Sequence, residues 1–176
     1  MKQNRENPFF ETYRTPFGTP PFDQIETEQY EPAFDEGIWQ LDEEVRAIAD
    51  NTELPTFENT IIALERSGKL LDKVISAFFN VLNAEADDEM MDISQRVSPK
   101  LSESSNNIYL NEQLFARVKS VYDRKDELHL PMEDARLLEK TFEAFCARGA
   151  ALGPEEKEKY RKLSSELSLL SLTFDQ

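Results

Sequence analysis

The stretch from Thr56 to Leu82 constrains the fold more than any other part of the chain, because its apolar residues alternate in a four-then-three spacing. This spacing places all of these side chains on one face of an α-helix. The residues on this face are Phe57, Ile61, Leu64, Gly68, Leu71, Ile75, Phe78 and Leu82. We therefore predict one continuous helix over 57–83, roughly 40 Å long, with Thr56 as its N-cap. Because such a helix buries one face against other helices, the pattern indicates an all-α fold.

Five other segments show the same spacing, so the prediction is about six mostly antiparallel helices joined by short loops. The other helices are expected over 32–50, from Asp87, after Asn111, over 132–148 and from Pro154. Pro99 predicts a kink or a break in the helix that starts near Asp87, and Gly149 predicts a left-handed stop. The apolar face of the last helix comprises Tyr160, Leu163, Leu167, Leu170 and Phe174.

Residues 1–31 form the one segment without helical periodicity. Its first twenty-two residues contain four prolines among five aromatic residues, which are Phe9, Phe10, Tyr13, Phe17 and Phe22. Prolines fix φ and remove hydrogen-bond donors, so we predict an extended arm. Because a disordered tail rarely carries so many aromatics, we expect the arm to dock onto a surface, either of this chain or of a missing part. The predicted organisation is thus an arm over 1–31 and a helical domain over 32–176.

Several motifs together resemble a known family. They are NPFF at 7–10, TPFGTPPF at 15–22, FDQIETEQYEPAFDEGI at 22–38, the 56–82 stretch, NIYLNEQLFARV at 107–118 and GAALGPEEKEKYRKLSSELSLL at 149–170. In order and spacing they resemble the N-terminal part of the peptidyl-dipeptidases (dipeptidyl carboxypeptidases), relatives of oligopeptidase A and thimet oligopeptidase. The resemblance covers nearly the whole chain and rests on packing and capping motifs.

The resemblance implies a neurolysin-like N-terminal helical domain of a zinc metallopeptidase. In that family the N-terminal helices form one wall of a deep channel that admits short peptides, and peptidyl-dipeptidases release dipeptides from the C-terminal end. The implied partners are the C-terminal catalytic domain of the same chain and short peptide substrates. The zinc of the family is held by H-E-x-x-H and a downstream glutamate.

This sequence offers no such ligand set. Its one histidine, His129, lies in the turn ELHLP, and a catalytic zinc site normally needs three protein ligands. We therefore predict an exposed turn residue at His129 and assign no catalytic, cofactor-binding or metal-binding residue in the chain. Cys146 excludes an internal disulfide, and its apolar setting, TFEAFCARG, predicts a buried small side chain.

The net charge of the chain disfavours some classes of binding partner. With 35 acidic against 20 basic residues, the net charge of −15 argues against binding to nucleic acids or to anionic membranes. From Asp23 to Glu58 there are twelve acidic residues and only Arg46 as a base. A solvated helix face is the favoured interpretation of this segment, and an acidic wall that attracts basic peptides is the alternative. No leader or membrane-spanning run occurs in the sequence as written, so we expect a cytoplasmic protein.

The last helix is still in register at Phe174 and shows no stop signal before Gln176, which indicates a chain cut from a longer protein. We expect that such a cut exposes an apolar patch, which the fragment could hide by dimerising. A free-standing helical adaptor that binds a partner helix is the alternative function. The parent reading frame distinguishes the two, because only a peptidase would continue to an H-E-x-x-H motif.

Overall fold

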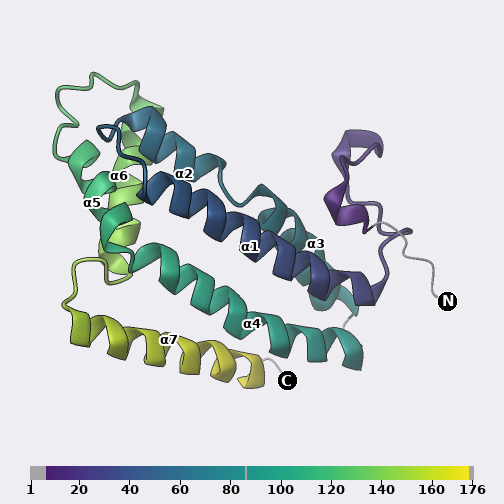
Figure 1. The fold of residues 1–176 in the computed structure, drawn as a ribbon. Coiled ribbons are helices and arrows are strands. Elements are labelled where there is room, and N and C mark those ends of the chain that lie inside the picture. The colour runs from purple at the N-terminus through teal and green to yellow at the C-terminus, as the bar shows by residue number, and fades with distance from the viewer. Residues whose placement is uncertain (1–6, 86, 175–176) are drawn as a thin grey trace. The chain divides into compact units, whose positions relative to one another are not determined.

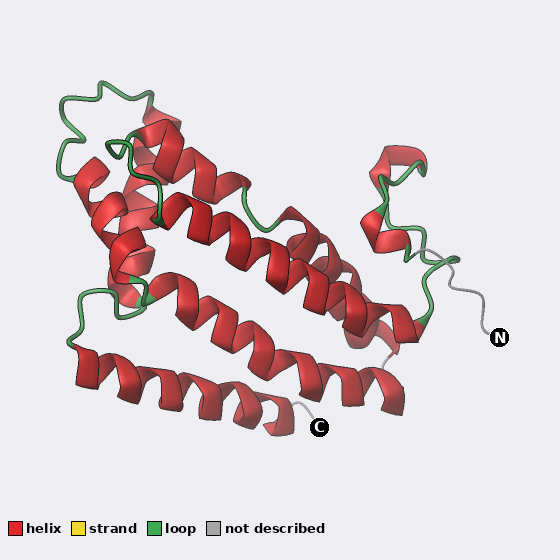
Figure 2. Ribbon diagram, viewed as in Figure 1, coloured by secondary structure: helices red, strands yellow, loops and turns green. Residues whose placement is uncertain are grey.

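The computed structural model describes residues 7–85 and 87–174, and within these ranges the chain contains helices and no strand (Figures 1 and 2). The helices are α1 (Tyr30–Ala49), α2 (Ala63–Arg66), α3 (Lys69–Glu85), α4 (Asp88–Tyr109), α5 (Glu112–Tyr122), α6 (Met132–Ala147) and α7 (Pro154–Phe174). A π-helix, η4 (Phe57–Ile62), precedes α2, and the arm contains three 3₁₀ turns, η1 (Pro8–Phe10), η2 (Pro16–Gly18) and η3 (Thr27–Gln29). The predicted all-α class is confirmed.

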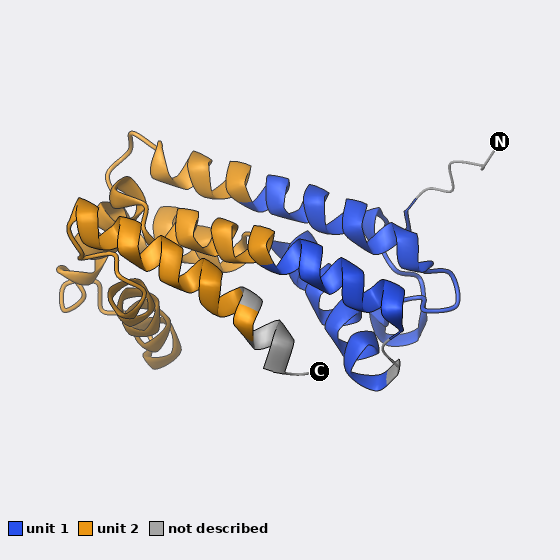
Figure 3. Cartoon of the chain, turned by 90° about the horizontal axis from the view of Figure 1, so that it is seen from below, with its two compact units in different colours: residues 1–41, 68–98 blue, residues 42–67, 99–176 orange. Residues whose placement is uncertain are grey.

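The chain forms two compact units (Figure 3). The first comprises residues 1–41 and 68–98, and the second comprises residues 42–67 and 99–176. Helices α1 and α4 each contribute to both units. The division into an arm over 1–31 and a helical domain over 32–176 stays a prediction.

Aromatic side chains build the core of the first unit. The ring of Phe78, on α3, is fully buried and lies 5.1 Å from the ring of Tyr30 and 5.2 Å from that of Phe34, both on α1. Phe9 of the arm completes the cluster, with its ring 5.3 Å from Tyr30. The edge-on geometry of the Phe78 pairs with Tyr30 and Phe34 adds stabilisation to that of burial. The arm therefore docks onto this chain's own helices, which is one of the two alternatives that the sequence left open.

A buried cation organises the second unit. Arg117 of α5 is 6% exposed, and its Nη1 donates to the backbone oxygens of Asn51 at 2.6 Å and Glu53 at 3.0 Å. Its Nη2 donates to Asn59 Oδ1 at 3.0 Å. One guanidinium thus binds the loop after α1 and the first turn of η4 to α5.

The structure shows the predicted N-caps and the predicted helix stop at the expected residues. Thr56, Asp87 and Asn111 each accept a hydrogen bond from the backbone N–H three residues later, at 3.0, 2.8 and 2.9 Å. At the end of α6, Gly149 has a φ of 88°, as expected of a left-handed stop. The N-caps and this stop are therefore confirmed.

The prediction of a continuous helix over 57–83 is wrong, because the chain leaves the helix between α2 and α3. Ser67 is extended, with ψ 158°, and its hydroxyl donates to Leu64 O at 2.6 Å. Gly68 follows with φ 76°, and a Cβ there would lie 3.2 Å from Leu41 Cδ1. A serine that bonds back to the preceding turn and a glycine in left-handed conformation end the helix. The apolar face persists on both sides, since Ile61 and Leu71 are buried.

Of the kink or break predicted at Pro99, the break does not occur, because α4 runs from Asp88 to Tyr109 with Pro99 inside it. Proline removes one backbone donor from a helix. Burial of Val97, two residues earlier, and of Ser104, five residues later, holds the helix against the rest of the structure on both sides of Pro99. Tertiary packing therefore outweighs the local penalty.

The left-handed conformation of Gly68 allows a prediction for a substitution that adds one methyl group. We expect Gly68→Ala to lower the free energy of unfolding by about 1–2 kcal/mol, because an L-residue in left-handed conformation is strained and the methyl group would approach Leu41. Urea unfolding followed by circular dichroism measures the change. Gly153→Ala is the matched control, since a Cβ at Gly153 meets only Glu156 Oε2 at 3.7 Å. An equal loss in both variants would contradict this account.

Removal of the Arg117 guanidinium should cost more than removal of a surface charge on the same helix. We expect Arg117→Ala to lower the free energy of unfolding by about 3 kcal/mol, because it removes a buried guanidinium and its hydrogen bonds to the carbonyl oxygens of Asn51 and Glu53. Lys119→Ala removes an exposed ion pair with Asp123 and should cost about 0.5 kcal/mol or less. Similar losses for the two variants would show that the guanidinium does not hold the loop.

Candidate functional site

The described residues do not form a metal site. No group of three His, Cys, Asp or Glu side chains among them is arranged to hold a metal ion. His129 is exposed in the turn before α6, where its Nδ1 lies 3.1 Å from Asp126 O, as predicted for a turn residue.

The expectation of a buried Cys146 is wrong, because this residue is exposed on α6. The buried face of α6 carries Leu138 and Phe145. Cys146 follows Phe145 directly, and consecutive helical residues point about 100° apart. The apolar residues around Cys146 in the sequence suggested burial, but its thiol lies one helical position away from the buried face.

Within the first unit, Lys73 of α3 holds the arm against the helices. Its Nζ donates to Phe9 O at 2.8 Å and to Glu11 O at 2.6 Å. The same ammonium lies 3.7 Å from the centroid of the Tyr13 ring, a cation–π contact. The sequence analysis missed this role, because the carbonyl partners are 62 and 64 residues away and leave no local pattern.

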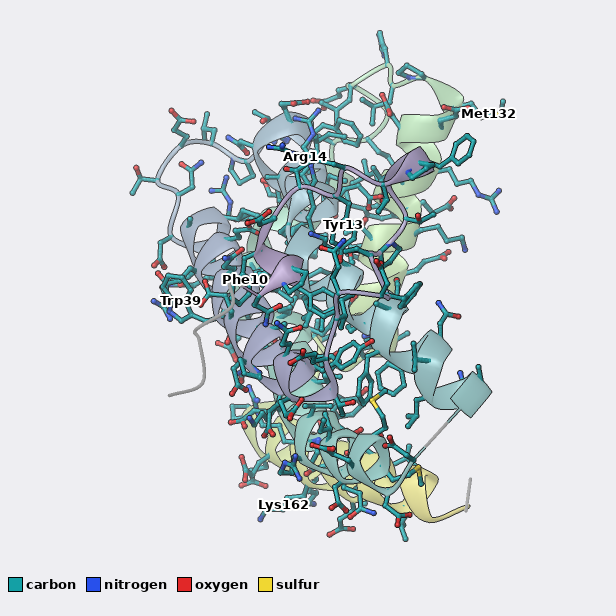
Figure 4. All side chains as sticks on the ribbon, turned by 90° about the vertical axis from the view of Figure 1, so that its right-hand side faces the viewer. Phe10, Tyr13, Arg14, Trp39, Met132 and Lys162 are labelled. Atoms are coloured by element: carbon teal, nitrogen blue, oxygen red, sulfur yellow. The ribbon has the colours of Figure 1, made fainter. Side chains whose placement is uncertain are left out.

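A surface cavity of about 900 Å³ lies where the arm meets α1 and α3. Its lining mixes aromatic, acidic, basic and amide side chains with backbone: Phe9, Phe10, Glu11, Thr12, Tyr13, Gly18, Glu36, Gln40, Lys69, Leu70 and Lys73. In Figure 4, Phe10, Tyr13 and Arg14 mark the course of the arm. The lining of the cavity thus carries both acidic and basic side chains.

Burial perturbs two groups beside this cavity. Desolvation raises the pKa of Tyr13 to about 12, with a smaller contribution from the nearby Tyr30. Desolvation also lowers the pKa of Lys73. The Tyr13 hydroxyl is buried and has no hydrogen-bond partner in the described part of the chain. These shifts therefore reflect how the arm is packed.

A second cavity of the first unit, about 660 Å³, has acidic walls. Its charged lining residues are Glu28, Glu31, Asp35, Glu36, Glu89 and Arg96. Arg96 Nε donates to Glu31 Oε2 at 3.0 Å. Four of the twelve acidic residues between Asp23 and Glu58 thus line one concave surface, and the action of this segment on basic peptides stays an open alternative.

Helix α7 reverses the expected orientation of its two sides. Its polar side faces α4 within the second unit (Figure 1): Asn106 Nδ2 donates to Ser164 Oγ at 2.7 Å, and Arg161 Nη1 donates to Asn107 Oδ1 at 2.9 Å. Three residues of the predicted apolar face are exposed instead, namely Leu163 at 65%, Leu167 at 66% and Leu170 at 55%. The Phe174 side chain lies outside the described side chains. We call the three exposed leucines the leucine stripe.

The Tyr13 hydroxyl gives a test of how the arm is packed. We expect Tyr13→Phe to raise the free energy of unfolding at pH 7 by about 1 kcal/mol, because it removes a buried hydroxyl that lacks a partner. The free phenol ionises near pH 10, whereas Tyr13 in the folded chain ionises near 12. Ionisation of the unfolded state therefore lowers the stability of the wild-type chain as pH rises from 10 to 12.

Tyr13→Phe removes this loss, so its advantage over wild type should grow between pH 10 and 12. Urea unfolding at pH 7, 10 and 11.5 measures the difference. Phe10→Leu, a change without an ionisable group in the same arm, should keep the wild-type pH dependence. A constant difference between Tyr13→Phe and wild type across this range would contradict a raised pKa.

No protein-family model matches this chain. The chain is 43% identical to the dipeptidyl carboxypeptidase of Escherichia coli (strain K12), over 97% of this chain and 25% of that protein. It is 39% identical to the dipeptidyl carboxypeptidase of Salmonella typhimurium over the same shares of both chains. Identity to oligopeptidase A of Escherichia coli (strain K12) is 23%, over 89% of this chain and 23% of that protein.

These matches agree with the resemblance drawn from the sequence motifs. The chain spans about a quarter of the length of the curated relatives that it matches. Within the described residues, no helix is both long enough and apolar enough to cross a membrane. Over the quarter of their length that it spans, the chain is a homologue of the two dipeptidyl carboxypeptidases, with oligopeptidase A as a more distant relative.

Proposed function

We propose that this chain is a non-catalytic helical part of a zinc-dependent peptidyl-dipeptidase, which releases dipeptides from the C-terminal end of short peptides. The observation that carries the proposal is the 43% identity to a dipeptidyl carboxypeptidase over 97% of this chain. The same match spans only 25% of that protein, which leaves ample length elsewhere for a catalytic site. We place the zinc and the reacting groups in that remaining length.

In this proposal the chain contributes one wall of the substrate channel. A rigid helical wall would exclude folded proteins and admit extended peptides, so its contribution is to substrate selection and not to bond cleavage. The acidic cavity of the first unit fits such a wall, because Glu28, Asp35 and Glu89 would favour peptides with basic residues. Short peptides and the remainder of the same polypeptide are the proposed partners, and the cytoplasm is the proposed location.

The leucine stripe supports the existence of a partner surface. A helix in water normally buries its apolar side, yet α7 directs Ser164 and Arg161 towards α4 and leaves Leu163 exposed. We propose that the remainder of the peptidase covers the stripe. Dimerisation of the 176-residue chain through the stripe stays a prediction, as does the adaptor alternative, in which a helix of a separate protein would cover it.

Activity measurements test the proposal. We expect the full-length parent protein to release dipeptides from N-blocked peptides with a free C-terminus, and chelators to abolish this release. The 176-residue chain should be inactive on the same peptides. A peptide of the same sequence with an amidated C-terminus is the control, because removal of the terminal carboxylate should prevent cleavage by a peptidyl-dipeptidase.

Two results would contradict the proposal. Peptide hydrolysis by the 176-residue chain, or tight binding of one zinc ion per chain, would show that the active site lies within these 176 residues and not outside them. Cleavage of the amidated peptide at internal bonds would support a peptidase activity of the parent protein but contradict the release of C-terminal dipeptides. Purification and mass spectrometry of the products separate these cases.

A further inference from the structure

The arm presents one aromatic side chain on a tight, locked turn. The turn η2 carries Phe17 at its centre and is closed by two backbone hydrogen bonds, Gly18 N to Thr15 O at 3.1 Å and Thr19 N to Pro16 O at 3.4 Å. The hydroxyl of Thr19 also donates to Pro16 O, at 3.2 Å. The turn is therefore held by its own residues, and the position of Phe17 on the arm is well defined.

Phe17 has an unfavourable backbone conformation and a fully exposed ring. Its φ is 61° and its ψ is 12°, a left-handed conformation that is rare for a bulky L-residue. Its exposure is 104%, whereas Phe9 of the same arm is 1% exposed. Burial within the described structure therefore does not compensate the strain at Phe17. Strained residues of this kind occur mainly where function requires the geometry.

The prolines around the turn prepare it for binding. Pro16 precedes Phe17 directly, and Pro20 and Pro21 follow the turn. Each proline fixes its own φ, so the arm loses little conformational entropy when the ring of Phe17 becomes buried. Pre-organised aromatic side chains are typical anchors of protein interfaces.

Charge indicates which surface would receive the ring. Between residues 7 and 29 the arm contains Glu11, Asp23, Glu26 and Glu28 against the single base Arg14. A second copy of the chain would bring a net charge of −15 against the same charge, which disfavours self-association. A complementary surface is apolar at its centre and basic at its rim.

Chain length indicates where such a surface lies. The chain spans only 25% of the dipeptidyl carboxypeptidase to which it is 43% identical. A surface elsewhere on the same polypeptide would be present at high effective concentration, which favours it over a separate protein. This step rests on the proposed function only in requiring that the parent chain is longer, and it requires no peptidase activity.

We propose that Phe17 is an anchor residue that inserts into an apolar pocket with a basic rim, on the part of the parent peptidase that lies outside these 176 residues. The arm then has two faces. Phe9 and the carbonyl oxygens bound by Lys73 attach it to α1 and α3, and Phe17 attaches it to the remainder of the protein.

Photo-crosslinking identifies what the ring contacts. Phe17 is replaced by p-benzoyl-L-phenylalanine in the full-length parent, which is irradiated, digested and analysed by mass spectrometry. We expect an intramolecular adduct with a peptide outside residues 1–176. The same replacement at Leu54 is the control, because Leu54 is an 81% exposed apolar residue in a loop of the second unit. Its adduct yield sets the background.

Trypsin cleavage after Arg14 gives a second measurement. We expect cleavage in the full-length parent to be slower than in the 176-residue chain by about tenfold or more, the effect of an anchor worth about 1.4 kcal/mol. Phe17→Gly should abolish this protection, and Phe17→Tyr should retain it. Each variant is compared with the same variant of the 176-residue chain, which cancels any effect on the turn itself.

Three results would overturn the proposal. Adducts between two molecules would identify a second copy as the occupant, and adducts with a different protein in a mixture would identify a separate partner. An adduct yield at position 17 no higher than at position 54, together with equal trypsin rates, would show that the ring stays in water. An intramolecular adduct in a parent protein without peptidase activity would support the docking of Phe17 and contradict only the proposed function.

Discussion

Contacts between cations and backbone carbonyl oxygens hold the irregular parts of this protein in place. Arg117 binds the carbonyl oxygens of Asn51 and Glu53 in the second unit, and Lys73 binds two carbonyl oxygens of the arm in the first. Segments without regular secondary structure leave carbonyl oxygens without N–H partners, and unpaired buried carbonyls are costly. A single long cationic side chain satisfies two of them at once. In a chain with an excess of acids, these two basic side chains thus bind the main chain.

The packing of each unit leaves some apolar side chains exposed. The polar side of α7 faces α4, so the leucine stripe lies outside the core of its unit. The arm shows the same division at smaller scale, because Phe9 is buried on α1 while Phe17 is exposed. Apolar groups on the surface are typical of a segment that is covered in a larger assembly. This pattern is the basis of our proposal that another part of a longer protein covers these side chains.

Much of the site could not be predicted from the sequence, because its key contacts join distant residues. His129 was placed correctly in an exposed turn, since a polar loop before α6 is a local property. The role of Lys73 was not foreseen, because its partners Phe9 and Glu11 lie more than sixty residues away. The exposure of Cys146 was missed for a different reason: one position on a helix separates a buried side from an exposed one.

The sequence by itself determined the helical class, the capped starts at Thr56, Asp87 and Asn111, and the stop at Gly149. These features depend on spacing and on hydrogen bonds within a few residues. The tertiary structure alone decided that the chain turns at Gly68, where Leu41 approaches, and that α4 continues through Pro99. It also decided which side of α7 faces α4. Periodicity shows that a helix has an apolar side, but only packing against the other elements decides whether that side is buried.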